Sequence, residues 1–228
     1  TPPRLDPGLA ESWDASDDSS EFVFHLRTNA RFHDGTPVNA EAVKFSFQRV
    51  MAMQQGYSWM WAEVTDDSSV TVVDDYTVKF TLSQPMSSFL WTMGSLRIVS
   101  PTTIKEHEVD GDWAAAWMID HTAGSGPYTV KTWRPGELYE FVRNEDYWKP
   151  FPHETSPDVF RYVVYREPGP ALLGLIAGDL AWSSYIGEEE ATQLNKSDTA
   201  EAFFRPAVVL SHLFMRFADV DARKVVKD

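Results

Sequence analysis

Two short runs in this sequence contain residue types that hydrolases use, but their spacing fits no catalytic motif. Gly124-Ser125-Gly126 lacks the spacing of a nucleophile elbow, in which a serine stands on a sharp turn between strand and helix. His107-Glu108 could begin a zinc-binding helix, but that motif needs a second histidine at position 111, which is Gly. Paired carboxylates for glycoside cleavage stay open, because the distance between two carboxyl groups depends on the fold.

The remaining acidic and imidazole groups predict no metal site. The six histidines are scattered without a close pair, so a metal site would have to assemble from distant segments. Asp110 and Asp112 do not continue into a calcium-binding loop. Glu188-Glu189-Glu190 suits the solvated start of a helix, where negative charge is favourable. Apart from the open possibility of paired carboxylates, the sequence predicts no catalytic residue, no metal and no cofactor.

The charge and composition describe an acidic protein without disulfides. The 228 residues carry 34 acidic and 20 basic side chains, a net charge of −14, which argues against binding to nucleic acid. Such a field mildly favours neutral or cationic ligands, although salt screens it beyond about 8–10 Å. Cysteine is absent, and no stretch approaches the roughly 20 apolar residues of a membrane span.

Aromatic residues are abundant, with 9 Trp, 8 Tyr and 14 Phe. They suit the half-buried face of a sheet, and some of the tryptophans could line a binding cleft. The tryptophan count also leaves two alternatives: an enzyme with an aromatic-lined cleft, carbohydrate-active or otherwise hydrolytic, and a carbohydrate-binding module.

The hydrophobic pattern predicts an α+β region that leads into an α/β region. Strands are expected at residues 9–13, 21–27, 70–73, 77–82, 128–133, 138–143, 159–165 and 180–183. Helices are expected after Asn39 as N-cap, at 89–93, within 102–117, and at 171–177 and 188–194. The alternation of strands and helices after Val159 argues against a carbohydrate-binding module.

Several segments, in the same order over most of the chain, resemble the motifs of one protein family. They are Leu9-Ala10-Glu11-Ser12-Trp13, Phe22-Val23-Phe24-His25-Leu26-Arg27, Phe32-His33-Asp34-Gly35-Thr36-Pro37, Asp75 to Leu82, Gly124-Ser125-Gly126-Pro127-Tyr128, Arg143-Asn144-Glu145-Asp146-Tyr147-Trp148, and Gly178-Asp179-Leu180-Ala181. The family is the extracytoplasmic solute-binding proteins, family 5, which serve the oligopeptide, dipeptide and nickel ABC importers. The resemblance implies binding and delivery without chemistry.

The resemblance also implies a fold and its division. It indicates a lobe of the periplasmic binding protein-like (type II) fold, incomplete because family members are longer and have two lobes. Residues 1–123 resemble the smaller β-rich subdomain of the first lobe, and 124–200 resemble part of its main α/β subdomain. Residues 201–228 resemble the approach to the second lobe, where the sequence stops. Arg216 departs from the pattern, because the family usually carries Asn there.

The resemblance points to three groups of candidate ligand-binding residues. Arg97 stands four residues before Pro101, where nickel-type members place an arginine that grips a ligand carboxylate; an Arg fork can make two parallel charge-assisted bonds. A structural salt bridge is the alternative. Trp59 and Trp61 follow the first helix, where the same members place a cleft tryptophan, and ordinary packing is the alternative.

The third group is Trp182, Ser183, Ser184 and Tyr185, at a strand end that faces the cleft between lobes in the family. An aromatic ring with hydroxyls suits a small polar ligand.

These implications define the expected function. The chain is expected to belong to the substrate-binding component of an ABC transporter, which captures peptides or a similar solute for a membrane permease. It is expected to be a monomer without nucleic-acid partners, in the periplasm or tethered outside the membrane as a lipoprotein. A chemoreceptor-adaptor role would leave the same sequence signals.

Overall fold

The computed structural model describes residues 4–66, 68–151, 156–183 and 186–202. The chain forms two compact units, Thr1–Val164 and Tyr165–Asp228. Residues on both sides of the expected subdomain boundary at 123 and 124 fall in the first unit, and the three-part division stays a prediction.

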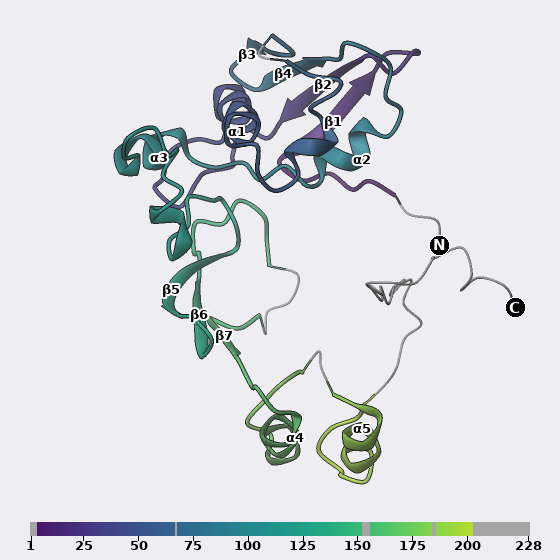
Figure 1. The fold of residues 1–228 in the computed structure, drawn as a ribbon, viewed down its shortest axis with the longest axis vertical. Helices are drawn as coiled ribbons and strands as arrows, with labels where there is room; N and C mark the ends of the chain where they lie inside the picture. The colour runs from purple at the N-terminus through teal and green to yellow at the C-terminus, as the bar shows by residue number, and fades with distance from the viewer. Residues whose placement is uncertain (1–3, 67, 152–155, 184–185, 203–228) are drawn as a thin grey trace, which may run out of the picture. The chain divides into compact units, whose positions relative to one another are not determined.

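A four-stranded antiparallel sheet forms one part of the first unit (Figure 1). Its strands lie in the order β1 (Ala10–Ala15), β2 (Glu21–Leu26), β4 (Thr77–Thr81) and β3 (Val70–Asp74). In β2, Phe22, Phe24 and Leu26 are buried and the residues between them are half-buried. This alternation confirms the predicted strand, because successive side chains point to opposite faces of a sheet.

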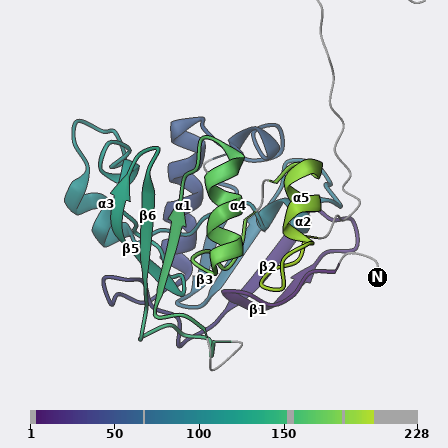
Figure 2. The same cartoon turned by 90° about the horizontal axis from the view of Figure 1, so that it is seen from below.

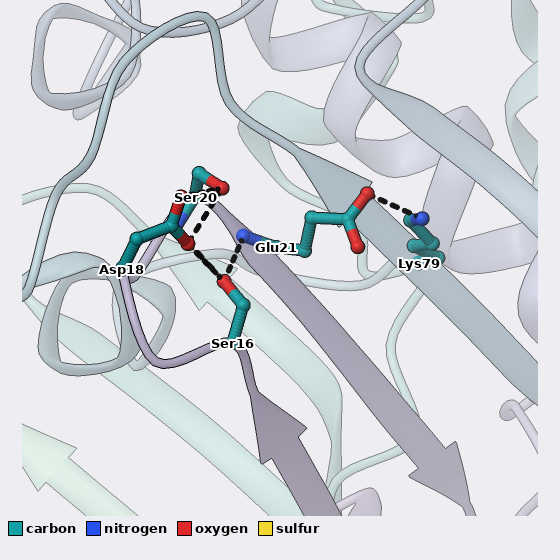
Figure 3. Close-up of polar contacts among 5 residues, drawn as sticks. All are labelled: Ser16, Asp18, Ser20, Glu21 and Lys79. Atoms are coloured by element: carbon teal, nitrogen blue, oxygen red, sulfur yellow. Dashed lines mark hydrogen bonds and ion pairs between the residues drawn. The ribbon is translucent and has the colours of Figure 1, made fainter.

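The turn between β1 and β2 is closed by its own polar side chains (Figure 3). Ser16 Oγ donates to Asp18 Oδ1 over 2.6 Å and accepts the Glu21 N–H over 2.9 Å. The Glu21 carboxylate pairs with Lys79 Nζ of β4 at 2.5 Å. Hydrogen bonds from Ser16 and then Ser20 lower the pKa of Asp18. These contacts hold β1 and β2 in register and join β2 to β4.

Helix α1 (Ala40–Met53) covers the sheet beside β3 and β4. It begins as predicted, since the Asn39 side chain accepts the Ala42 N–H over 3.0 Å. On its buried face Phe47 packs edge-on against Phe80 of β4, with ring centroids 5.2 Å apart. The helix thereby encloses the main hydrophobic core of the unit.

In its described residues, four short helices lie between the longer elements of this unit. They are η1 (Ser58–Met60), α2 (Phe89–Met93), α3 (Pro101–His107) and η2 (Trp117–Ile119). The predicted short helix before Gly94 is confirmed by α2, and α3 confirms the partly helical prediction that follows.

The second sheet of this unit is antiparallel, in the order β5 (Tyr128–Arg134), β6 (Leu138–Arg143) and β7 (Val159–Val163). Gly136 takes a φ of 74° in the turn between β5 and β6, which confirms the predicted hairpin. Glu140 is buried between two cations, 2.8 Å from Lys131 Nζ and 2.5 Å from Arg161 Nε. This ionic cluster ties all three strands together.

The second unit contains α4 (Pro168–Ala177) and α5 (Glu188–Leu194), which lie side by side in Figures 1 and 2. The two helices are joined by a small apolar cluster around Leu172, Leu175 and Leu194. Both helices confirm the sequence prediction.

The predicted strand over residues 180–183 is wrong. After Gly178 takes a φ of 80°, the chain folds back on the end of α4, and the Leu180 N–H donates to the Gly174 carbonyl over 3.1 Å. The Leu180 side chain packs against Gly174 so closely that a Cβ atom at that glycine would lie 3.0 Å from it. This local packing satisfies the backbone and leaves no extended run for a strand.

Candidate functional site

The segment from Phe32 to Pro37, the most recognisable motif of the sequence, docks against a distant turn. The His33 N–H donates to the Gly124 carbonyl over 2.9 Å, and His33 Nε2 lies 3.0 Å from the Gly126 carbonyl. Phe32 is buried in a cluster with Ala30, Val38 and Ala42. Two motifs that are more than 80 residues apart therefore meet through the backbone and the side chain of His33, which both contact carbonyl groups of the distant turn, and this is a structural role.

The carboxylate of Asp34 joins this segment to the start of α3. It accepts the Thr36 N–H over 2.8 Å, the Thr36 hydroxyl over 2.6 Å and the Thr103 hydroxyl over 2.7 Å. It also accepts a short hydrogen bond from Ser100, whose Oγ caps the helix by accepting the Thr103 N–H. We call Asp34, Thr36, Ser100 and Thr103 the Asp34 junction.

The ionised form of Asp34 is strongly favoured. Partial burial alone would raise its pKa, but the hydrogen bonds from Ser100, Thr36 and Thr103 outweigh burial and lower the pKa to about 2. The groups that donate to the Asp34 carboxylate all belong to this chain, so the Asp34 junction has a structural role.

A cavity of about 300 Å³ opens between the C-terminal half of α1, the η1 region and the segment after α2. Its walls include the apolar groups of Met53 and Trp61 and the polar groups of Arg49, Tyr57, Ser95 and Arg97. We call this set of six residues the Arg97 cavity. Arg97 and Trp61, two of the sequence-predicted candidates, thus line the same space.

Arg97 is exposed and its guanidinium is only partly engaged. Its Nη1 donates to the Gly94 carbonyl over 3.1 Å. Among the described residues it forms no ion pair with a carboxylate, so the salt bridge that was its alternative role is not seen there. The other N–H groups are available to an anion, because a guanidinium carries five donors.

Arg49 joins Arg97 at the cavity, and sequence reasoning missed it. Its Nε donates to the Trp113 carbonyl over 3.0 Å. Burial lowers the pKa of Arg49, and the negative charge of Asp112 acts in the opposite direction. One feature of the sequence could have indicated Arg49: it is a cationic residue next to Val50, at the edge of the apolar stripe of the helix.

The two tryptophans near η1 have different surroundings. Trp61 is 0% exposed: its ring packs against Phe47, with centroids 5.6 Å apart, and its Nε1 donates to Thr92 Oγ1 over 2.8 Å. It contributes a wall of the cavity from within the core. Trp59 is 69% exposed and does not line the Arg97 cavity.

A second cavity of about 380 Å³ lies against the inner face of the four-stranded sheet. Trp13, Phe24, Leu90 and Met93 are among its mainly apolar walls. Arg97 also lines this second cavity, so its side chain stands between an apolar space and the Arg97 cavity.

The structure describes two of the last four candidates, and both belong to the second unit. Trp182 is 66% exposed and Ser183 is half-buried. Ser184 and Tyr185 lie outside the described residues.

The described residues contain neither a cluster of metal ligands nor a helix that could span a membrane. In residues 4–66, 68–151, 156–183 and 186–202, no group of three or more His, Asp or Glu side chains could hold a metal ion. In the same part of the chain, no helix combines the length and apolar character that a membrane crossing requires.

Comparison with known proteins gives one family. The model of the bacterial extracellular solute-binding proteins, family 5 (middle region), matches residues 4–228. The probable D,D-dipeptide-binding periplasmic protein DdpA of Escherichia coli K12 is 34% identical over 209 residues, 91% of this chain and 39% of that protein. The glutathione-binding protein GsiB of the same strain is 26% identical over 93% of this chain and 40% of its own length.

Solved structures agree with these sequence matches. The periplasmic binding protein DppA from Helicobacter pylori, in complex with the peptide STSA, has a TM-score of 0.72 and 25% identity, covering 86% of this chain and 41% of that one. The binding protein AgaA from A. tumefaciens R10, in complex with agropinic acid, has a TM-score of 0.70 and 26% identity, covering 86% and 38%.

The matches confirm the predicted fold class, a lobe of the type II periplasmic binding protein architecture with mixed α/β content. The chain spans about two fifths of the length of the curated relatives it matches.

Proposed function

This chain belongs to the bacterial extracellular solute-binding proteins of family 5, and we propose that it supplies part of the first lobe of an ABC importer's substrate-binding component. The complete protein would capture a small solute outside the cytoplasmic membrane and deliver it to a membrane permease. Its similarity to a probable D,D-dipeptide-binding protein and to a glutathione-binding protein supports a peptide as the solute.

The observation that carries this proposal is the incomplete engagement of Arg97. Its guanidinium is oriented by one backbone carbonyl and lines two cavities, while no carboxylate of the described residues pairs with it. The C-terminal carboxylate of a peptide matches the remaining donors, because an Arg fork makes two parallel charge-assisted bonds to a carboxylate. Met53 offers apolar surface beside that position, and the buried ring of Trp61 forms the wall behind it.

Capture in this proposal is conformational and involves no catalysis. Two lobes close about a hinge, and ligand contacts to both lobes shift the population toward the closed state. The protein would work as a monomer in the periplasm or on a lipid tether, and Trp59, Trp182 and Ser183 stay candidates for further ligand contacts, together with Ser184 and Tyr185.

A thermal-shift screen of the complete protein tests this function. The panel contains dipeptides and oligopeptides, metal chelates and oligosaccharides, each measured also with Arg97→Ala. A peptide that raises the melting temperature by mass action, with the effect lost in Arg97→Ala, is the expected result. A peptide effect that survives Arg97→Ala would keep peptide capture and remove Arg97 from the site. Turnover of a substrate without any thermal shift would replace the binding function with a hydrolytic one.

A further inference from the structure

The Arg97 cavity is positively charged although the chain as a whole is acidic. The chain carries 34 acidic and 20 basic residues, yet the charged residues among the described lining of this cavity are two arginines, Arg49 and Arg97. Surface charges farther away than about 8–10 Å are screened at physiological salt. The local field, set by the two guanidinium groups, therefore decides which ligand charge the cavity favours.

Both arginines are oriented by the backbone, and neither forms an ion pair among the described residues. Arg49 uses Nε for the Trp113 carbonyl, and Arg97 uses Nη1 for the Gly94 carbonyl. Neither forms an ion pair with a carboxylate in the part of the chain that the structure describes. One bond to a carbonyl limits the movement of each side chain and leaves donors of each guanidinium for an anion.

The partly buried charge of Arg49 is compensated only in part, by the charge of Asp112. Removing a guanidinium from water disfavours its charged form, and burial is the larger influence on Arg49, ahead of the charge of Asp112. An anion bound in the cavity would offset this cost. Tyr57 and Ser95 add two hydroxyl donors, and neither hydroxyl has a hydrogen-bond partner among the described residues.

From these observations we infer that the ligand carries two anionic groups, one held by Arg97 and the other by Arg49, as in a peptide with an acidic side chain next to its C-terminal carboxylate. The inference deepens the proposed function and rests on it for the identity of the ligand as a peptide. It reverses the expectation from net charge, which favoured neutral or cationic ligands.

The test uses two dipeptides of nearly equal shape, Ala-Glu and Ala-Gln, and the dianion glutarate. Binding to the complete protein is measured by calorimetry and thermal shift for the wild type, Arg49→Gln, Arg97→Gln and Arg31→Gln. Arg31 is the matched control, because its Nη1 also donates to a backbone carbonyl, that of Gly35, at 3.2 Å, and it does not line the cavity.

We expect Ala-Glu to bind the wild type and Arg31→Gln about tenfold or more tightly than Ala-Gln, as a charge-assisted bond implies. In Arg49→Gln this ratio falls to about 1, whereas Arg97→Gln weakens both peptides. Equal binding of the two peptides by the wild type would overturn the inference and leave peptide capture standing.

Glutarate separates the inference from the proposed function. Stabilisation by glutarate that disappears in Arg49→Gln and Arg97→Gln, without binding of either peptide, would support a dianion site and reject peptide capture. Stabilisation by none of the three probes would overturn the inference. Should Arg49→Gln fail to fold, Arg49→Lys replaces it. This variant is expected to weaken the binding of Ala-Glu severalfold without changing the binding of Ala-Gln, and equal weakening of both peptides would count against the inference.

Discussion

The Asp34 junction and the Arg97 cavity use charged side chains in opposite ways. At the junction, one carboxylate accepts bonds from Thr36, Ser100 and Thr103, so its hydrogen-bonding capacity is used inside the chain. At the cavity, each of two guanidinium groups has one backbone carbonyl as its hydrogen-bond partner among the residues that the structure describes. A saturated charge holds segments together, whereas an oriented but unsaturated charge is available to a ligand. The motif that identifies the family thus lies in the first region, and the proposed binding groups lie in the second.

Trp61 gives the largest expected effect, because it belongs to the core and to the cavity wall at once. Trp61→Ala removes a ring that is fully buried against Phe47 and should lower the free energy of unfolding by about 3–5 kcal/mol. Trp59→Ala, on the exposed side of η1, should change it by less than about 0.5 kcal/mol. Urea denaturation measures both, and similar losses would contradict the assignment of Trp61 to the core.

Asp34→Ala tests the structural role of the saturated carboxylate. It leaves the hydroxyls of Ser100 and Thr103 without their acceptor and should cost about 1–2 kcal/mol of unfolding free energy. Asp17→Ala, an exposed acidic position in the turn between β1 and β2, is the matched control and should have little effect. Equal stability of the two variants in urea would show that the junction contributes nothing.

The low pKa of Asp34 predicts an acid-dependent loss of stability. Its pKa is about 2 in the folded chain and 3.8 as the ordinary value, so the folded state favours the ionised form. The resulting stabilisation, about 1 kcal/mol after allowance for solvent exposure, is complete above pH 5 and is lost as the pH falls from about 4 to about 2. The stability difference between wild type and Asp34→Ala should shrink over that range; a constant difference would refute the linkage.

Arg97→Gln gives the smallest expected effect on stability. Arg97 is exposed and, within the described part of the chain, its guanidinium makes one bond to a carbonyl, so the free energy of unfolding should change by less than about 0.5 kcal/mol. A loss above 1 kcal/mol in urea denaturation would mean that Arg97, like Asp34, serves the fold.

Most elements of the fold could be predicted because their signals are local. The alternation at Phe22, Phe24 and Leu26, the cap at Asn39 and the turn at Gly136 each depend on a few neighbouring residues. The strand expected at residues 180–183 failed because Leu180 packs back on α4, and periodicity alone does not distinguish a short apolar run that extends from one that folds back.

The site was less predictable, because it depends on contacts between distant segments. Trp59 and Trp61 are two residues apart in similar sequence, but the turn of η1 exposes one ring and buries the other. Arg49 lines the Arg97 cavity because α1 and the segment after α2 both contribute to its walls. The spacing of residues in the sequence does not predict this arrangement. The family resemblance predicted Arg97 as a candidate, and the three-dimensional structure was needed to show that Arg49 lines the same cavity.

The most direct test of this contrast is one calorimetric titration series, in which the complete protein, Arg97→Gln and Asp34→Asn bind the same peptide found in the thermal-shift screen. The account predicts that Arg97→Gln lowers the affinity by about tenfold or more with an unchanged melting temperature. It predicts that Asp34→Asn lowers the melting temperature and keeps the affinity. The reverse pattern, with affinity lost at Asp34 and stability lost at Arg97, would contradict it.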